Sequence, residues 1–238
     1  MKPYLLFDEG GTLVFPNIEW LSSLVKKYGF NIDPDILFEK ACEVGYLVDL
    51  QLSKNEEPKQ ENFLSSFFKI TLKDLIDSEE KLNSIIEEAV SENKKKSLWA
   101  YTFEWIRKTL ERLKNEGYKM SVISNSDGRA ESILYETGLR GFMEKIYDSH
   151  IIGISKPDVG IFNRALDDLS IASEDALYIG DMFYIDVLGA NKAGIPAIHL
   201  DPFGFYRGWK GVRIPSIAKI FTILKNHKFN SRDFFPFV

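Results

Sequence analysis

The sequence contains a single cysteine, Cys42, among its 238 residues. One thiol excludes an intrachain disulfide and every metal site built from several cysteines. Histidine is scarce as well, because only His150, His199 and His227 are present. No two of them stand at the spacing of a metal site, and nothing in the sequence supports Ser-His-Asp chemistry. The chain must therefore draw its chemistry from other side chains.

Long apolar runs are also missing. No run approaches the ~20 residues of a membrane-spanning helix, and the first residues lack the long apolar core of a secretory signal. We therefore expect a cytoplasmic protein without a membrane partner. Positive charge is in deficit, with 30 Lys and Arg against 35 Asp and Glu and a net charge of −5. Nucleic-acid partners favour basic surfaces, so we expect none.

Short apolar runs alternate with helical patterns along much of the chain. The apolar runs cover residues 4–8, 119–125, 176–181 and 196–201. Continuous runs of this kind are typical of parallel strands that are buried on both faces. Amphipathic helical patterns cover residues 102–117, 158–169 and 185–194. The alternation predicts an α/β fold, with a Rossmann-like open parallel sheet and helices on both faces.

Residues 14–97 interrupt this alternation. The block is helical throughout and contains no convincing strand, with clear amphipathic segments in "IEWLSSLVKKYG" and "SEEKLNSIIEEAVSENKKK". The second segment has an acidic first turn and a lysine-rich end, as the helix dipole favours. We therefore predict a helical domain at 14–97, inserted into an α/β core formed by 1–13 and 98–238.

Polar side chains follow the predicted strands, at the point where each strand ends. Open α/β sheets bind ligands beyond the carboxyl ends of their strands, so these residues are the candidates for a site. They are Asp8, Ser124, Asn125, Lys156, Asp181 and Asp186.

Three of these candidates are carboxylates. Asp8, Asp181 and Asp186 offer the hard oxygen ligands that Mg²⁺ prefers, and we predict that they converge on one ion. Lys156 and Ser124 are suited to hold an anionic group nearby.

The loop after Asp8 has few side chains. Gly10, Gly11 and Thr12 would expose backbone N–H groups close to a ligand. Asp8 would then be free to attack a phosphoryl centre as a carboxylate nucleophile.

Four segments of the chain resemble the motifs of the haloacid dehalogenase superfamily, in the family's order. They are "LLFDEGGTL", "SVISNS", "SKPDVGIF" and "YIGDMFYID". The helical insert resembles the cap that this family places between motifs one and two. The resemblance implies a hydrolase that forms an aspartyl-phosphate on Asp8. Ser124 would bind the phosphoryl oxygens, and Lys156 would offset the charge between nucleophile and phosphate.

The resemblance also implies a cofactor and a substrate class. Mg²⁺ would be held by Asp8, Asp181 and the backbone carbonyl of Gly10, with Asp186 supporting the metal site. The substrate would be a small phosphorylated metabolite. It would be bound by Gly11, Thr12, Ser124, Asn125 and Lys156.

Gly10 departs from the pattern of the family's phosphatases. They carry a second aspartate there, which protonates the leaving alcohol and then helps water attack the intermediate. Loss of such a group typically costs ~10²–10⁴ in rate. Glu9 does not obviously replace it, because adjacent side chains on an extended strand point to opposite faces. We therefore expect Glu9 to face away from Asp8.

Four interpretations follow. The chain is a phosphatase that is slow or needs a good leaving group, or a non-catalytic protein of this fold that binds a phosphorylated ligand or a protein partner. The third interpretation is a phosphonate-cleaving enzyme, because that branch of the family has a small residue at the position of Gly10. The fourth is a haloacid dehalogenase, but those enzymes lack the metal-binding acidic pair, so the two aspartates of "GDMFYID" argue against it. The phosphatase is favoured, because Asp8, Ser124, Lys156, Asp181 and Asp186 are all present. A non-catalytic protein has little physical reason to keep three crowded carboxylates, since they repel one another unless a cation neutralises them. The phenylalanine-rich tail after residue 226 is compatible with a monomer or a homodimer.

Overall fold

The computed structural model describes residues 2–56 and 63–226, so the phenylalanine-rich tail lies outside the described residues. The chain divides into two compact units. One combines Met1–Phe15 with Thr102–Val238, and the other is Pro16–Tyr101. We describe them as the α/β unit and the helical unit.

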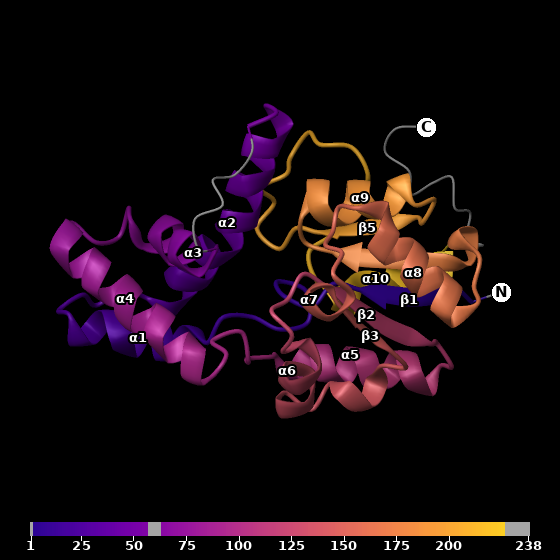
Figure 1. Ribbon diagram of the computed structural model, residues 1–238, viewed down its shortest axis with the longest axis horizontal. Helices are drawn as coiled ribbons and strands as arrows, with labels where there is room; N and C mark the ends of the chain where they lie inside the picture. Colours follow the sequence, from indigo (N-terminus) through magenta and orange to yellow (C-terminus); the bar gives the residue numbers. More distant parts are fainter. Residues whose placement is uncertain (1, 57–62, 227–238) are drawn as a thin grey trace. The chain divides into compact units, whose positions relative to one another are not determined.

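A six-stranded parallel sheet forms the centre of the α/β unit (Figure 1). Its strand order is β3-β2-β1-β4-β5-β6. The two central strands, β1 and β4, are buried along their whole length. The strands are β1 (Tyr4–Phe7), β2 (Met120–Ser124), β3 (Ile146–Asp148), β4 (Ala176–Gly180), β5 (Ala197–Leu200) and β6 (Val212–Ile214).

The predicted parallel sheet is confirmed, but two of its strands were not predicted. β3 and β6 are the two edge strands, and each has three residues. Both are partly exposed, so neither forms the continuous apolar run that marks a central strand. From sequence alone, a strand with so short and incomplete an apolar pattern cannot be distinguished from a loop.

Helices cover both faces of the sheet, with α5 and α6 on one face and α8 and α9 on the other (Figure 1). The predicted apolar stripe of α5 is confirmed, since Ile106, Leu110 and Leu113 are fully buried. Asp158 caps the N-terminus of α8 as predicted, because its side chain accepts a hydrogen bond from the Gly160 N–H at 2.8 Å. The helices are α5 (Glu104–Asn115), α6 (Ala130–Glu136), α7 (Ser149–Ile152), α8 (Val159–Leu169), α9 (Leu188–Lys192) and α10 (Ile220–Asn226).

The helix predicted at 185–194 has an irregular start. Residues Phe183–Val187 form one π-helical turn, and only Leu188–Lys192 is α-helical. π-Helical turns are rare and occur frequently at functional sites. This turn carries Asp186, which is buried.

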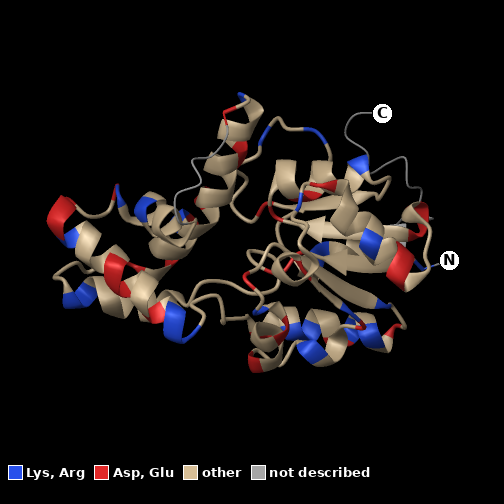
Figure 2. Cartoon of the chain, viewed as in Figure 1, with Lys and Arg blue, Asp and Glu red and all other residues tan. Residues whose placement is uncertain are grey.

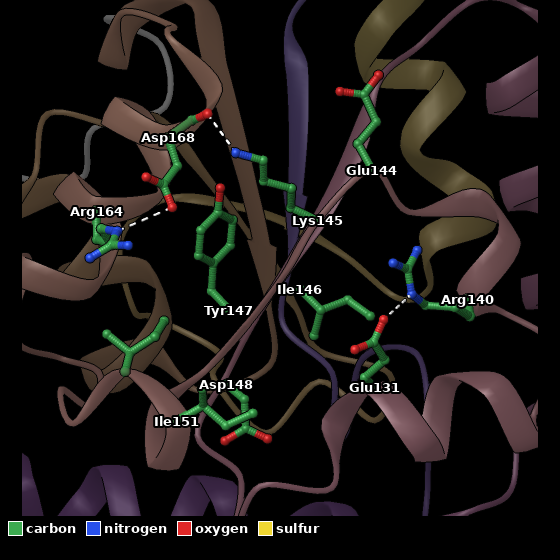
Figure 3. A pocket seen from close by; sticks show the side chains of 11 residues that line it. Glu131, Arg140, Glu144, Lys145, Ile146, Tyr147, Asp148, Ile151, Arg164 and Asp168 are labelled. Atoms are coloured by element: carbon green, nitrogen blue, oxygen red, sulfur yellow. Dashed lines mark hydrogen bonds and ion pairs between the residues drawn. The ribbon is translucent and has the colours of Figure 1, made fainter.

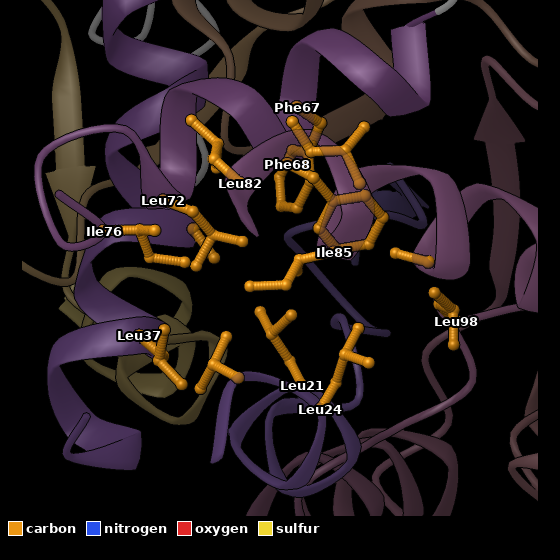
Figure 4. Close-up of a cluster of buried hydrophobic side chains, with 14 of the residues drawn as sticks. Leu21, Leu24, Leu37, Phe67, Phe68, Leu72, Ile76, Leu82, Ile85 and Leu98 are labelled. Atoms are coloured by element: carbon orange, nitrogen blue, oxygen red, sulfur yellow. The ribbon is translucent and has the colours of Figure 1, made fainter. Parts of the chain in front are cut away.

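The helical unit is built from α1 (Ile18–Lys27), α2 (Pro34–Ser53), α3 (Phe63–Leu72) and α4 (Glu79–Lys95). Ser78 caps α4, whose first turn is acidic and whose last turn is basic, as predicted. The helices share a core of aliphatic and aromatic side chains (Figure 4). Leu21, Leu37, Leu72 and Ile85 are each at most 1% exposed in it. Burial of these apolar side chains stabilises the fold of the helical unit.

Charged residues of both signs are spread over the surface helices of both units (Figure 2). Among the described residues, no helix has the length and apolar composition needed to span a bilayer.

Candidate functional site

Three carboxylates meet at the carboxyl edge of the sheet. Asp8, Asp181 and Asp186 each offer an oxygen, and these oxygens lie within 4.8 Å of one another. The sheet brings them together, because Asp8 directly follows β1 and Asp181 directly follows the neighbouring β4. The Asp8 N–H donates to the Ile179 carbonyl at 2.8 Å, which fixes the end of β1 against β4.

Lys156 is buried in the same cluster. Its Nζ donates to Asp8 Oδ1 at 2.5 Å, to Asp186 Oδ1 at 2.7 Å and to the Tyr178 hydroxyl at 2.9 Å. An ammonium has three hydrogens, so all of them have acceptors. The Lys156 side chain is 2% exposed, and its charge is therefore compensated almost entirely by protein groups.

Asn125 fixes the backbone of Lys156. Its Nδ2 donates to the Lys156 carbonyl at 2.9 Å, and its Oδ1 accepts from the Lys156 N–H at 2.8 Å. This reciprocal pair joins the end of β2 to the segment that carries the lysine. The amide predicted to bind substrate is thus engaged in positioning Lys156.

Two glycines allow the carboxylates to approach. A Cβ on Gly180 would lie 2.5 Å from Asp186 Cγ, closer than real Cβ contacts allow. A Cβ on Gly11 would collide with the Asp181 carboxylate, and Gly11 has a φ of +83°, which favours glycine. The absence of side chains at these positions is therefore a condition for the acidic cluster.

Glu9 contacts Ser124, one of the predicted site residues. The Ser124 hydroxyl donates to Glu9 Oε2 at 2.8 Å, and both side chains are buried. The expected alternation does not apply, because β1 ends at Phe7 and the chain then turns. In that turn the Glu9 carbonyl accepts from the Leu13 N–H at 2.8 Å and the Val14 N–H at 2.9 Å.

Thr12, predicted to bind substrate, lies in the same turn. Its side chain is fully buried, and Oγ1 has no hydrogen-bond partner among the described residues. Gly10 and Gly11 are half-buried in this turn, next to the acidic cluster.

Burial shifts the pKa values of the acids in the site. It raises the pKa of Asp8 to about 6, with Lys156 opposing the shift and Asp186 adding to it. It raises the pKa of Glu9 to about 8, against the hydrogen bond from Ser124. The pKa of Asp181 is raised well above its usual value by burial and by the charges of Asp8 and Asp186.

Lys156 responds in the opposite way to its neighbours. Burial lowers its pKa, but the charges of Asp186 and Asp8 outweigh burial and produce a net rise. Lys156 therefore stays protonated, and one positive charge faces three acids.

The cluster fits a divalent cation. Mg²⁺ takes oxygen ligands at about 2.0–2.1 Å in an octahedron, which places neighbouring oxygens about 3 Å apart. One oxygen from each of the three carboxylates lies within 4.8 Å of the others, so small side-chain adjustments would bring these oxygens to the spacing of an octahedral Mg²⁺ site. Both oxygens of Asp186 already accept hydrogen bonds, from Lys156 and Tyr178 on one side and from the Met182 N–H on the other. Direct coordination therefore suits Asp8 and Asp181, with Asp186 supporting them.

Sequence reasoning missed Tyr178 and assigned no role to His199. Tyr178 is a hydroxyl-bearing residue inside an otherwise apolar strand, and that contrast was the available signal. His199, expected to be a satisfied core or edge residue, is buried in β5, and its Nε2 lies 2.8 Å from the Asp181 carbonyl. Its Nδ1 has no partner among the described residues.

A separate hollow of about 400 Å³ runs along the edge strand β3 (Figure 3). Its charges are largely paired, since Arg140 contacts Glu131 and Arg164 contacts Asp168. None of the predicted site residues lines it. The lining residues are Glu131, Arg140, Glu144, Lys145, Ile146, Tyr147, Asp148, Ile151, Ile152, Arg164 and Asp168.

Residues 44–200 match the family described as haloacid dehalogenase-like hydrolases. The matched segment contains Ser124, Lys156, Asp181 and Asp186 but begins after Asp8. It covers more than half of the chain.

Curated relatives match over part of the chain. The glyceraldehyde 3-phosphate phosphatase of Pyrococcus furiosus is 36% identical over 94 residues, which are 39% of this chain and 39% of that protein. Haloacid dehalogenase-like hydrolase domain-containing protein 3 of Xenopus laevis is 30% identical over 96 residues, or 40% of this chain and 39% of that protein. The matches thus span about two fifths of the length of these relatives.

Solved structures share the fold across nearly the whole chain. The magnesium-bound HAD-hydrolase YfnB from Bacillus subtilis has a TM-score of 0.65 and 16% identity, covering 94% of this chain and 100% of that chain. A HAD phosphatase from Thermococcus onnurineus has a TM-score of 0.58 and 20% identity, covering 96% of this chain and 100% of that chain. At these identities the likeness establishes the fold alone.

Proposed function

Since the chain belongs to the haloacid dehalogenase-like hydrolase family, we propose that it is a Mg²⁺-dependent phosphohydrolase acting on a small phosphorylated metabolite. The observation that carries the proposal is the buried contact of Lys156 with both Asp8 and Asp186, beside Asp181. A lone buried lysine among three acids matches a site for a metal ion and a phosphoryl group. The phosphatase names of the curated relatives agree with this class of reaction.

In the proposed reaction Asp8 is the nucleophile. One of its carboxylate oxygens attacks phosphorus, the bond from phosphorus to the leaving oxygen breaks, and that oxygen departs with the electron pair. Water then attacks the phosphorus of the aspartyl-phosphate, and the bond to Asp8 breaks to release inorganic phosphate. Lys156 offsets negative charge at the nucleophile. The Ser124 hydroxyl, which donates to Glu9 in this structure, would turn its hydrogen from Glu9 to a phosphoryl oxygen.

Mg²⁺, when bound, would neutralise negative charge on the transferring phosphoryl group. Asp8 and Asp181 would hold it directly, together with the Gly10 carbonyl, and Asp186 would support it. Burial is the main cause of the raised pKa of Asp8 and of Asp181, and the cation would relieve the smaller part that comes from repulsion among the carboxylates.

Gly10 limits the reaction that we propose. No carboxyl stands at this position to protonate the leaving oxygen or to activate water, so both steps lack the usual general acid–base. Substrates with a good leaving group, such as acyl phosphates, need the least protonation. We further propose that the helical unit, predicted at 14–97, acts as the cap that contacts the rest of the substrate. The cytoplasmic location and the choice between monomer and homodimer stay predictions.

The test is hydrolysis of an aryl phosphate and of a panel of phosphorylated metabolites that includes glyceraldehyde 3-phosphate. Wild type and Asp8→Asn are compared, each with Mg²⁺ and with EDTA. Hydrolysis that requires Mg²⁺ and Asp8 supports the proposal. Silence across the panel, with orthophosphate still bound, would instead favour a non-catalytic protein that binds phosphorylated ligands.

A further inference from the structure

His199 connects strand β5 to the backbone of Asp181. It lies in β5 beside Gly180, the last residue of β4, and its ring nitrogen Nε2 lies 2.8 Å from the Asp181 carbonyl oxygen. A carbonyl oxygen only accepts hydrogen bonds, so Nε2 carries the hydrogen and donates it. Asp181 directly follows Gly180, and its carboxylate is one of the three in the acidic cluster. His199 therefore contacts this cluster through the main chain of Asp181.

Two aromatic neighbours hold the imidazole ring of His199. The ring centroid of His199 lies 4.2 Å from that of Tyr206 and 5.8 Å from that of Phe183. Phe183 is the first residue of the π-helical turn that also carries Asp186. His199 is 1% exposed, so water competes little with its hydrogen bond. One ring thus contacts both segments that supply Asp181 and Asp186.

The second ring nitrogen makes histidine an unfavourable residue for packing alone at this position. Nδ1 of His199 is buried without a hydrogen-bond partner among the described residues. A buried polar atom without a partner lowers stability, and an apolar side chain at the same site would bury no such atom. The hydrogen bond that Nε2 donates to Asp181 is therefore the contact that accounts for a histidine in this buried strand.

We propose that His199 is a positioning residue that fixes the backbone of Asp181, so that its carboxylate is in place for Mg²⁺. The inference rests on the proposed function, in which Asp181 is a direct metal ligand. Asp181 is the first residue after β4, so its carbonyl lies just beyond the regular part of the sheet. A ligand whose backbone is already held loses less entropy when it binds the ion. Groups that support metal ligands in this way typically change metal affinity about 10–100-fold.

Calorimetric titration of Mg²⁺ into the substrate-free protein at pH 8 tests the inference. Wild type is compared with His199→Leu, which removes the donor, and with His199→Gln and His199→Asn. The glutamine amide can place an N–H where Nε2 stands, whereas the asparagine side chain is one carbon shorter and its amide does not reach the carbonyl. We expect His199→Leu and His199→Asn to weaken Mg²⁺ binding about tenfold, and His199→Gln to stay within about threefold of wild type.

A matched control on the same strand separates positioning from folding. Ile198 is fully buried in β5, so Ile198→Val should lower the melting temperature of the metal-free protein. It should leave the affinity for Mg²⁺ unchanged. A merely structural role for His199 predicts the same pattern for His199→Leu, whereas a positioning role predicts that the affinity for Mg²⁺ falls as well.

A loss of less than about threefold in a folded His199→Leu, or in His199→Asn if the leucine variant does not fold, would overturn the inference and leave the proposed function intact. Binding by His199→Gln as weak as that by His199→Leu would overturn it too. A wild type that binds no Mg²⁺ would overturn both. A wild type that binds Mg²⁺ but hydrolyses no phosphate ester would overturn the proposed function alone.

Discussion

The Tyr178 hydroxyl accepts a hydrogen bond from Lys156 Nζ at 2.9 Å, inside the sheet and out of contact with solvent. It is the one acceptor of the lysine, among the described residues, that carries no charge. Tyr178 Oη also lies 3.1 Å from Asp186 Oδ1 and 3.3 Å from the Ile123 carbonyl, so its own hydrogen has acceptors. The hydroxyl therefore sets where the ammonium stands between the two acids.

Tyr178→Phe should slow hydrolysis. Removal of the hydroxyl leaves one N–H of a buried ammonium without an acceptor, which costs about 1–3 kcal/mol. If about half of this appears in the barrier, kcat for an aryl phosphate falls about two- to tenfold. Tyr147→Phe is the control, because the Tyr147 hydroxyl lies 3.4 Å from the Ala165 carbonyl, away from the acidic cluster. Unchanged kcat in a folded Tyr178→Phe would show that Lys156 does not need this contact.

Asp181→Asn should have opposite effects on stability with and without Mg²⁺. Burial and the charges of Asp8 and Asp186 raise the pKa of Asp181 well above its usual value, so the ionised group destabilises the metal-free protein. The neutral amide should raise the melting temperature of the metal-free protein by about 2–4 °C, the shift that ~1 kcal/mol produces at this size. It should also abolish the increase that Mg²⁺ gives to wild type.

Asp201 provides a matched control for the Asp181→Asn experiment. Asp201 is buried, and its carboxylate accepts from the Phe205 N–H at 2.8 Å and the Tyr206 N–H at 3.2 Å. Asp201→Asn should lower stability and keep the Mg²⁺ increment. If Asp181→Asn instead retains the increment, Asp181 is not a metal ligand.

The acidic cluster was predictable from sequence because it depends on strand ends. The central strands have complete apolar patterns, and parallel strands place their carboxyl ends at one edge. Asp8, Lys156, Asp181 and Asp186 could therefore be grouped without coordinates. The edge strands could not be found in the same way, because three partly exposed residues carry little pattern.

The contacts around the cluster were not predictable for a different reason. Tyr178 reads as one more large residue of a buried strand, and only the neighbouring segments show which groups its hydroxyl meets. The contact of Glu9 with Ser124 was not foreseen, because period-two alternation was extended past Phe7, where the strand ends. Side-chain direction in a turn depends on the turn's own hydrogen bonds, which the residue pattern does not give.

Mg²⁺ binding should weaken as pH falls through about 6. Burial raises the pKa of Asp8 from 3.8 to about 6, so this group stabilises the metal-free protein fully below pH 3.8 and loses that contribution as pH rises through 6. Protons therefore compete with the metal in acid. Calorimetric titration at pH 5 and pH 8 should show about a tenfold weaker affinity at pH 5, with proton release on binding. Affinity independent of pH over this range would exclude Asp8 as a ligand.

Gly10→Asp should accelerate turnover if the missing acid–base limits the wild type. Unlike Gly11, Gly10 does not have a positive φ, so an aspartate is compatible with the backbone there. The new carboxyl would stand two residues after the nucleophile, where it can protonate the leaving oxygen and then activate water. Steady-state hydrolysis of an aryl phosphate should rise at least about tenfold, within the range such groups contribute.

The intermediate provides an independent readout of the same substitution. In wild type, slow attack by water should let the phosphorylated form of Asp8 accumulate, and mass spectrometry of acid-quenched protein would detect it. Gly10→Asp should lower that fraction, whereas Gly10→Ala, which adds a side chain without an acid, should leave both rate and fraction near wild type. A Gly10→Asp protein that folds and binds Mg²⁺ but turns over no faster would argue that the chain binds phosphorylated ligands without hydrolysing them.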